Sequence, residues 1–293
     1  MDRKTILVAM MGAYKSLGAH YYELMVDTAR QVGLGVGWNL LMPAWVFEPT
    51  PITVELFQVR SPYTHPGLLA EHLSALAEAS MLVPDPQGGY HLTANGREIT
   101  QKIYGAAYRV MEKLQSLPLT DLEQLAGLLR RLVDASLAAP EPPGKWSIHL
   151  SCKTDPGDQA HLIVRIDQYL SDLWAYRDDA HLASWRPLGV NGPAWDALTS
   201  LWRGEGDSPV TIQQKLARRG FSAADYAEEL GNLAGRGWVE ETAGRFRLTV
   251  KGNGIRQVAE ELTDRYFYAP WAYLSIIELD DLYNLLVRFR ETL

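Results

Sequence analysis

The sequence predicts a mainly α-helical protein built from two similar halves, each with one small β-hairpin. Three observations lead to this prediction. Residues recur at a spacing of 157, apolar residues follow a helical spacing in most segments, and two short strand-like stretches flank turns that contain glycine. With 293 residues and 47% hydrophobic content, the chain is long enough for two domains and can bury a core.

The internal repeat is an ordered series of matches across most of the chain. A shift of 157 residues places Trp195 on Trp38 and Trp202 on Trp45. A shift of 156 places the Leu-Thr-x-x-Gly of 248–252 on that of 92–96, and a shift of 160 places the Leu-x-Asp-Leu of 279–282 on that of 119–122. Because the shift changes only where loops are expected, we interpret the chain as an internal duplication.

The second half begins with two predicted helices. Apolar residues at helical spacing predict a helix over 193–202, which follows the helix breakers Asn191 and Gly192. Ser208-Pro209 predicts the start of a short helix that runs through Leu216, and Gly220 predicts its end.

A third helix and a hairpin follow. Ser222 is a suitable cap for a helix from Ala223 to Ala234 or Gly235. The segments 238–239 and 246–250 predict two strands around a Glu-Glu-Thr-Ala-Gly turn, and Thr249 leads into a long helix. The corresponding segments of the first half are a helix over 67–80, a turn over 84–89 and the Leu-Thr-x-x-Gly of 92–96.

This order of elements, with Leu-x-x-Leu-Ala-x-x-Gly-Trp-Val followed by Phe-x-Leu-Thr-x-x-Gly, resembles the winged-helix domain of MarR-like transcriptional regulators. The resemblance covers roughly 38–130 and 195–290. It implies tandem winged-helix repeats, with the recognition helices at 67–80 and 223–235. Because MarR-like proteins are dimers held by their terminal helices, it also implies an intramolecular pseudo-dimer with flanking interface helices, expected at 18–31, 119–135, 163–175 and 280–292.

A proline-rich segment separates the two halves. The residues Ala-Ala-Pro-Glu-Pro-Pro-Gly over 138–144 are typical of a linker. We therefore expect an N-terminal repeat over 1–137, a linker over 138–148 and a C-terminal repeat over 149–293.

DNA binding is the function that the resemblance implies, and the charge pattern bears on it. The net charge of −7 argues against a strongly basic nucleic-acid binder, and both predicted recognition helices are acidic, with Glu71 and Glu78 in the first and Asp225, Glu228 and Glu229 in the second. The second half nevertheless has basic residues near its recognition helix and wing. The expected DNA-binding residues are Lys215, Arg218, Arg219, Ser222, Asn232, Arg236, Arg245, Arg247 and Lys251.

A small-molecule site is the second expectation. Tryptophans at equivalent positions of the two halves fit either a buried core or an aromatic cavity near the pseudo-two-fold axis, where MarR-like proteins often accept small aromatic or amphipathic ligands. The expected ligand-binding residues are Trp38, Trp45, Trp174, Tyr176, Arg177, His181, Trp195 and Trp202.

The densest polar cluster is Arg177-Asp178-Asp179-Ala180-His181. Three interpretations stay open: a network that holds the helices between the two halves, a ligand site, or a metal or acid–base site formed by Asp178 and His181.

Other features narrow the range of functions. The single Cys152 permits no internal disulfide, and no diagnostic enzyme, metal or cofactor motif is present, so we expect no catalytic activity and no cofactor. No apolar stretch is long enough to span a membrane, and no signal peptide is expected at the N-terminus. The prediction is a cytoplasmic monomer (a pseudo-dimer) or homodimer.

Two functions from different classes follow from the sequence. The first is a ligand-responsive DNA-binding transcriptional regulator, with double-stranded DNA and a small ligand as partners. The second is a winged-helix scaffold that has lost DNA binding and binds a small aromatic molecule or a protein.

Overall fold

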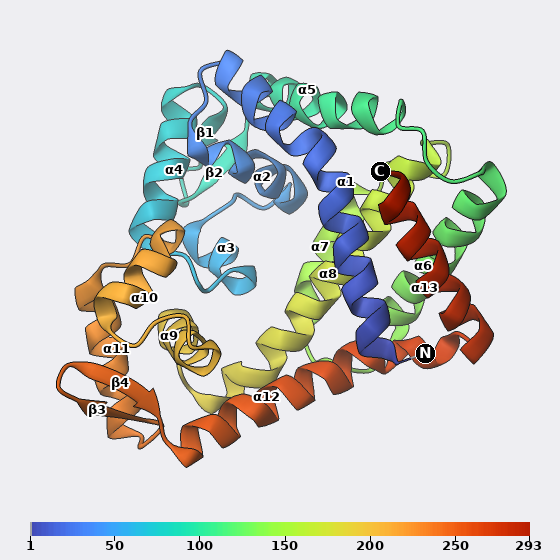
Figure 1. Ribbon diagram of the computed structural model, residues 1–293. Helices are drawn as coiled ribbons and strands as arrows, with labels where there is room; N and C mark the ends of the chain where they lie inside the picture. The colour runs from blue at the N-terminus through green and yellow to red at the C-terminus, as the bar shows by residue number, and fades with distance from the viewer. Residues whose placement is uncertain (1) are drawn as a thin grey trace.

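The computed structural model describes residues 2–293, which form a mainly helical structure with two small antiparallel sheets (Figure 1). In the first part of the chain the elements, with 3₁₀ helices labelled η, are α1 (Arg3–Gln31), η1 (Val36–Leu40), α2 (Leu41–Phe47), α3 (Val54–Arg60), α4 (Pro66–Glu78), β1 (Leu82–Pro84), β2 (Tyr90–Leu92), α5 (Ala94–Met111) and α6 (Leu119–Ala138).

A short segment, α7 (Trp146–Ser151) and η2 (Cys152–Thr154), leads to the second part. Its elements are α8 (Leu162–Trp185), η3 (Arg186–Leu188), α9 (Gly192–Arg203), α10 (Pro209–Lys215), η4 (Ala217–Arg219), α11 (Ala223–Gly235), β3 (Val239–Thr242), β4 (Arg245–Leu248), α12 (Val250–Tyr268), η5 (Pro270–Tyr273) and α13 (Ile276–Thr292). In both parts, a long helix is followed by short helices, a hairpin and two long helices.

Most predicted elements are confirmed, with differences at their ends. The helix expected over 223–235 is α11, and that expected over 67–80 is α4. The helices expected over 18–31 and 163–175 are longer, because α1 begins at Arg3 and α8 continues to Trp185. Trp38 and Trp45 lie on two consecutive short helices, η1 and α2, and Pro43, which has no backbone N–H, lies in the first turn of α2.

Each hairpin leads into a long helix through the same threonine–glycine arrangement. The side chain of Thr249 accepts a hydrogen bond from the Gly252 N–H at 3.0 Å, and its hydroxyl donates to the Gly237 carbonyl at 2.8 Å. A Cβ atom on Gly252 would lie 1.9 Å from the Trp238 carbonyl oxygen. The same contact at Gly96, 2.1 Å from the Met81 carbonyl oxygen, explains why both copies of Leu-Thr-x-x-Gly end in glycine.

The two parts of the chain exchange helices. The helix α1 packs against α5 of its own part and α13 of the other, while α8 packs against α12 of its own part and α6 of the other (Figure 1). Ion pairs between α6 and α13, such as Arg288–Asp121 at 2.5 Å, add to this packing. One large apolar core runs through these helices, and a smaller one lies beneath α9, α11 and the β3–β4 hairpin.

Candidate functional site

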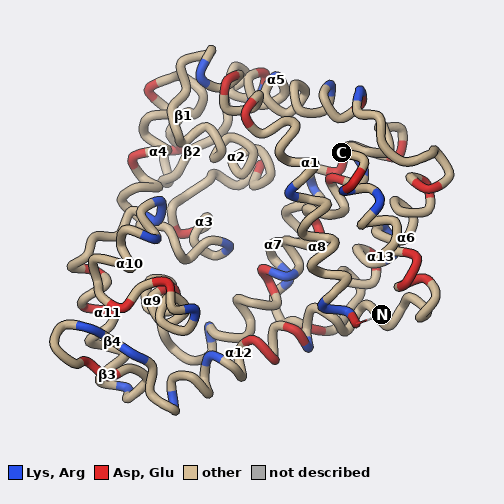
Figure 2. The backbone as a smooth tube through the Cα atoms, in the orientation of Figure 1, with Lys and Arg blue, Asp and Glu red and all other residues tan. Residues whose placement is uncertain are grey.

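The surface around α11 and the β3–β4 hairpin carries exposed basic side chains, and Figure 2 marks Lys and Arg positions in blue along the hairpin and near α10. We call this set the α11 rim: Lys215, Arg218, Arg236, Arg245, Arg247 and Lys251. Several rim cations pair with neighbouring carboxylates. Arg245 pairs with Asp207, Arg247 with Glu240 at 2.8 Å, and Lys215 with Glu205 at 3.8 Å. Because exposed ion pairs contribute only about 0–1 kcal/mol each, a phosphate could replace these partners at little cost.

Most acidic groups on α11 already have local partners. Asp225 accepts from the Ser222 backbone N–H at 2.7 Å, in a capping box that also uses the Ser222 hydroxyl. Glu229 accepts from Asn191 at 2.5 Å and from Asn232 at 3.3 Å. Because these partners are neutral, Asp225 and Glu229 keep their negative charge, and Glu228 is exposed, so α11 itself repels phosphate and the basic side chains around it are the groups that could contact DNA.

The equivalent surface of the first part has no lysine or arginine side chain. Residues 61–96, which include α4 and the β1–β2 hairpin, contain neither lysine nor arginine, and Glu71 and Glu78 are exposed on α4. In the turn between β1 and β2, Asp85 pairs with His91 at 2.9 Å. The two parts of the chain therefore present surfaces of different charge.

The start of α4 and the turn before α11 are in direct contact, at a place we call the seam. The His65 N–H donates to the Arg219 carbonyl oxygen at 2.7 Å, and the His65 and Phe221 rings meet edge to face, with centroids 5.1 Å apart. The Trp185 indole N–H donates to the Tyr63 hydroxyl at 2.8 Å. The N-terminal ends of the two predicted recognition helices consequently lie side by side.

Arg219 belongs to the seam and not to the α11 rim. Its guanidinium pairs with Asp196 at 3.2 Å and lies over the Tyr63 ring, 5.0 Å from the centroid. Of the other predicted DNA contacts, Arg236 donates to the Leu188 carbonyl at 3.0 Å, and Lys251 donates to the Arg236 carbonyl at 2.9 Å. Both of these side chains are exposed beside the hairpin.

Helix α8 has an unusual distribution of polar residues. No residue of α8 is exposed, because α1, α5, α6, α7 and α12 pack around it. Yet Asp167, Ser171, Trp174 and Asp178 are only half-buried and, at spacings of four, three and four, share one face. On this polar stripe, Asp167 accepts from the Tyr21 hydroxyl of α1 at 2.9 Å and Ser171 donates to the Tyr14 hydroxyl at 3.1 Å.

The network expected among Arg177, Asp178, Asp179 and His181 does not form, because successive helical residues point about 100° apart. Asp179 accepts from the backbone N–H groups of Ser147 and Ile148 at 2.7 and 3.0 Å, whereas Arg177 lies 4.0 Å from Asp264. Arg177, Asp179 and His181 thus connect α8 to α12, α7 and α9, whereas Asp178 lines a small pocket.

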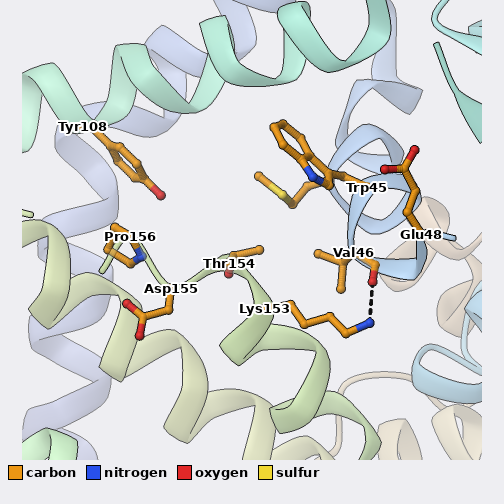
Figure 3. Close-up of a pocket in the computed structure, with 9 residues that line it drawn as sticks. Trp45, Val46, Glu48, Tyr108, Lys153, Thr154, Asp155 and Pro156 are labelled. Atoms are coloured by element: carbon orange, nitrogen blue, oxygen red, sulfur yellow. Dashed lines mark hydrogen bonds between the residues drawn. The ribbon is translucent and has the colours of Figure 1, made fainter. Parts of the chain in front are cut away.

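A pocket with a volume of about 610 Å³, called the larger pocket below, lies between α2, α5 and η2 with the residues that follow it (Figure 3). Its wall includes Met42, Trp45, Val46, Glu48, Tyr108, Lys153, Thr154, Asp155 and Pro156. The Trp45 and Tyr108 rings approach it from different helices. Lys153 donates to the Val46 carbonyl at 2.9 Å, and Asp155 accepts from the Gly157 N–H at 2.9 Å. Arg97 pairs with Glu48 and lies 5.6 Å from the Trp45 ring centroid.

A smaller pocket of about 220 Å³ lies at the seam. Its lining includes Arg60, Tyr63, Asp178, His181 and Arg219, which come from both parts of the chain. Burial lowers the pKa of His181 to about 4, so its ring is neutral at pH 7 and accepts the Trp195 indole N–H at 3.2 Å. Burial also raises the pKa of Asp178 to about 6.

The predicted ligand residues occupy several places. Trp45 and His181 line pockets, and Trp174 lies on the polar stripe of α8. Trp38 is buried, and the buried Tyr176 hydroxyl donates to the Glu141 carbonyl at 2.9 Å. Trp195 and Trp202 flank the buried guanidinium of Arg256. Its Cζ atom lies 5.1 Å from the Trp195 ring centroid and 4.7 Å from the Trp202 ring centroid.

Tyr14, Tyr108 and Asp167 were not among the site residues predicted from the sequence. The available signal was spacing, because Tyr14 and Tyr21 are seven residues apart and Tyr104 and Tyr108 four apart, as expected for residues on one helix face. Within residues 2–293, no three His, Cys, Asp or Glu side chains form a group suited to a metal ion. No helix in the same range is long and apolar enough to cross a membrane.

Comparison with known protein families gives a match for the second part of the chain. Residues 164–293, which span almost all of α8 through α13, match the model of a helix-turn-helix family. The second part of the chain therefore carries a helix-turn-helix domain, with α10 and α11 immediately before its hairpin. No curated protein and no solved structure matches the chain.

Proposed function

We propose that this protein is a ligand-responsive regulator that binds duplex DNA through the α11 rim of its second part. The observation that carries the proposal is that the exposed cations surround α11 and the hairpin inside the segment that matches a helix-turn-helix family. In winged-helix proteins of this kind, the helix enters a groove while basic residues around it contact phosphates. The proposal assigns no catalytic activity to the chain.

We further propose that the two parts are winged-helix units fused into a pseudo-dimer. Three features support this: the repeated order of elements, the exchange of α6 and α13 between the parts, and the two equivalent threonine–glycine junctions. Only the second unit has the charge for phosphate contacts, so DNA binding is asymmetric.

The ligand acts in this proposal through the space between the two units. The larger pocket involves α2 and α5 of the first unit and the segment that leads into α8 of the second. A ligand that fits one relative placement of the units better than another would shift the population of that placement, and with it the DNA affinity.

The test is the binding of a random-sequence duplex by the full chain as the salt concentration falls from about 200 to about 50 mM. We expect affinity to rise steeply. Combining Arg218→Ala, Arg245→Ala and Arg247→Ala should lower the slope of log affinity against log salt by about 2–3, because each phosphate contact contributes about 0.9. A matched control removes three exposed cations elsewhere, through Arg30→Ala, Lys102→Ala and Lys113→Ala. Equal losses in both triple variants would contradict a specific DNA face.

The seam favours a second candidate function, a winged-helix scaffold that does not bind DNA. Its contacts place the starts of α4 and α11 side by side, and α4 carries no cation. If neither the native chain nor a variant with a weakened seam binds duplex at low salt, the scaffold is the better description.

A further inference from the structure

The smaller pocket at the seam is lined by residues of both parts of the chain. Its wall combines the end of α3 and the loop that follows it with the C-terminal part of α8 and with η4. The lining residues are Arg60, Ser61, Tyr63, Asp178, His181, Leu182 and Arg219. Because both parts contribute to this wall, the pocket is complete only while the seam is closed.

Two opposite charges in this wall lack a direct partner. Arg60 and Asp178 are both half-buried, yet neither side chain forms a hydrogen bond or an ion pair with any residue in the described range 2–293. Burial raises the pKa of Asp178 to about 6, and Arg60 is the neighbouring charge that opposes this rise most strongly. The two groups are therefore neighbours without direct contact. Partial burial of an unpaired charge costs free energy, so this arrangement is unfavourable for stability alone.

The other polar side chains of the wall add no unbalanced charge. The Arg219 guanidinium pairs with Asp196 at 3.2 Å. The His181 ring is neutral at pH 7 and accepts the Trp195 indole N–H at Nε2, which leaves its own proton on Nδ1. The pocket therefore offers one free positive group from the first part of the chain and one free negative group from the second.

A small molecule that carries both charges matches this wall. A carboxylate on the ligand can form a charge-assisted, bidentate contact with the Arg60 guanidinium, and an ammonium group can donate to the Asp178 carboxylate. A ligand with only one of these groups would leave the other protein charge unpaired and would be repelled by it. The chemistry of the wall thus favours a zwitterion over a simple anion or a simple amine.

The size and the apolar surface of the pocket narrow the class further. The volume of about 220 Å³ lies below the range of about 300–1,000 Å³ that is usual for drug-sized ligands. The Leu182 side chain and the Tyr63 ring supply apolar surface beside the two charges. Both features suit a compact zwitterion with a short hydrocarbon side chain.

We propose that the smaller pocket binds a small aliphatic α-amino acid, with the carboxylate of the ligand at Arg60 and its ammonium group at Asp178. This site is separate from the larger pocket. The inference rests on the proposed function only for its effect on DNA affinity. Because the ligand would join α3 of the first part to α8 of the second, its binding should hold the seam closed.

The first test compares three probes with the same carbon skeleton: L-valine, isovalerate, which lacks the ammonium group, and isobutylammonium, which lacks the carboxylate. Calorimetric titration of the full chain at about pH 8, where Asp178 is ionised, should show L-valine binding at least about tenfold more tightly than either of the others. Equal or tighter binding of isovalerate or isobutylammonium would overturn the zwitterion class. If neither L-valine nor L-alanine binds at about 10 mM, the site itself is overturned.

Two variants separate contacts with the ligand from a structural effect, because they should change the ranking of the probes in opposite ways. Each should lower L-valine affinity about tenfold. In Asp178→Asn, isovalerate should bind at least as tightly as L-valine, since the ammonium group no longer has a carboxylate. In Arg60→Gln, isobutylammonium should bind at least as tightly as L-valine. The same loss for all three probes in both variants would contradict direct contacts.

A matched control alters another carboxyl group of α8. Asp172 is buried and already accepts hydrogen bonds from Ser151 at 2.6 Å and Gln168 at 2.8 Å, so Asp172→Asn should leave the ranking of the probes unchanged. A reversed ranking in this variant would show that the effect does not depend on the pocket wall.

Hydrogen exchange tests the connection to the seam. The His65 N–H donates to the Arg219 carbonyl oxygen, so its exchange reports opening of the seam. With L-valine at about ten times its Kd, this exchange should slow about tenfold, because opening must first release the ligand. Unchanged exchange at His65 under saturating L-valine would contradict a ligand that joins the two parts.

These outcomes are distinguishable from failure of the proposed regulator. The α11 rim does not contribute to the wall of the smaller pocket, so the triple rim variant should bind L-valine as tightly as the native chain. L-valine binding that leaves duplex affinity unchanged would support the amino-acid site and contradict its role in DNA binding.

Discussion

The backbone N–H of His65 donates a hydrogen bond of 2.7 Å to the carbonyl oxygen of Arg219, and so joins the start of α4 to the turn before α11. In paired helix-turn-helix units, the recognition helices occupy successive major grooves about 34 Å apart. The two equivalent helices cannot reach such sites while this contact persists. The proposed DNA binding therefore uses the second unit alone or requires the seam to open first.

Tyr63 is the residue whose loss should weaken the seam most directly. Tyr63→Ala removes the acceptor for the Trp185 indole N–H and the ring beneath Arg219, so we expect a loss of about 1–3 kcal/mol in the free energy of unfolding. The His65 amide should also exchange its hydrogen faster. Tyr22→Ala, at an exposed position on α1, is the control. Unchanged exchange at His65 would show that the seam does not depend on Tyr63.

Two glycines in the first turns of α12 should respond in opposite ways to the same substitution. Gly252→Ala would place a Cβ atom 1.9 Å from the Trp238 carbonyl oxygen and should cost about 3–5 kcal/mol. A Cβ atom on Gly254 would meet no atom within 4 Å, so Gly254→Ala should stabilise the helix by about 0.5–1 kcal/mol. Urea unfolding of both variants measures the difference, and similar values would refute the steric explanation of the Leu-Thr-x-x-Gly pattern.

His181 should make the folded state sensitive to acid. Burial, followed by the positive charge of Arg256, lowers its pKa from 6.5 to about 4. Between these values the unfolded chain binds a proton that the folded chain does not, so the stability present above pH 6.5 is lost as the pH falls towards 4.

The corresponding variant is His181→Gln. Between about pH 7 and about pH 4.5 it should lose about 2 kcal/mol less than the native chain, measured by urea unfolding at both pH values. Asp172 and Asp178, whose pKa values burial raises to about 6, act in the opposite direction in both proteins and cancel in this comparison. An identical pH dependence in the two proteins would contradict a neutral, buried His181.

The buried guanidinium of Arg256 is the fourth testable feature. Arg256 is 1% exposed, lies between Trp195 and Trp202, and pairs with Glu260 at 2.6 Å. Glu260→Gln leaves this cation unpaired and should cost about 3 kcal/mol, whereas Arg256→Met replaces it by an apolar chain and should cost clearly less. Thermal unfolding of the two variants provides the measurement, and a larger loss for Arg256→Met would indicate that the ion pair and its aromatic stacking stabilise the fold.

Local chemistry made much of the fold predictable. The Ser222 cap, Gly220 at φ +80° and the threonine–glycine junctions are each set by residues close in sequence, so α11, its preceding turn and both hairpins were predicted near their observed positions. The full lengths of α1 and α8 were not, because neither helix has one continuous apolar face. Each is held by several helices packed on different sides.

The candidate site was only partly predictable for the same reason. The sequence indicated the basic residues of the α11 rim and the pocket residue Trp45, which belong to recognisable local patterns. It did not indicate Asp167, because a carboxyl group among apolar residues has the same pattern whether it faces solvent or the interior. The single sequence likewise could not show that Arg219 belongs to the seam.

The sequence by itself determined the order of elements, the caps, the turns and the charge difference between the two surfaces, since these depend on neighbouring residues and composition. Only the tertiary structure decided that α6 and α13 exchange partners, that the starts of α4 and α11 meet, and that the Tyr21 hydroxyl donates to Asp167. These relationships join residues far apart in the sequence, with up to 273 positions between the hydrogen-bonded His20 and Leu293. Long-range packing with burial, rather than local propensity, sets their free energy.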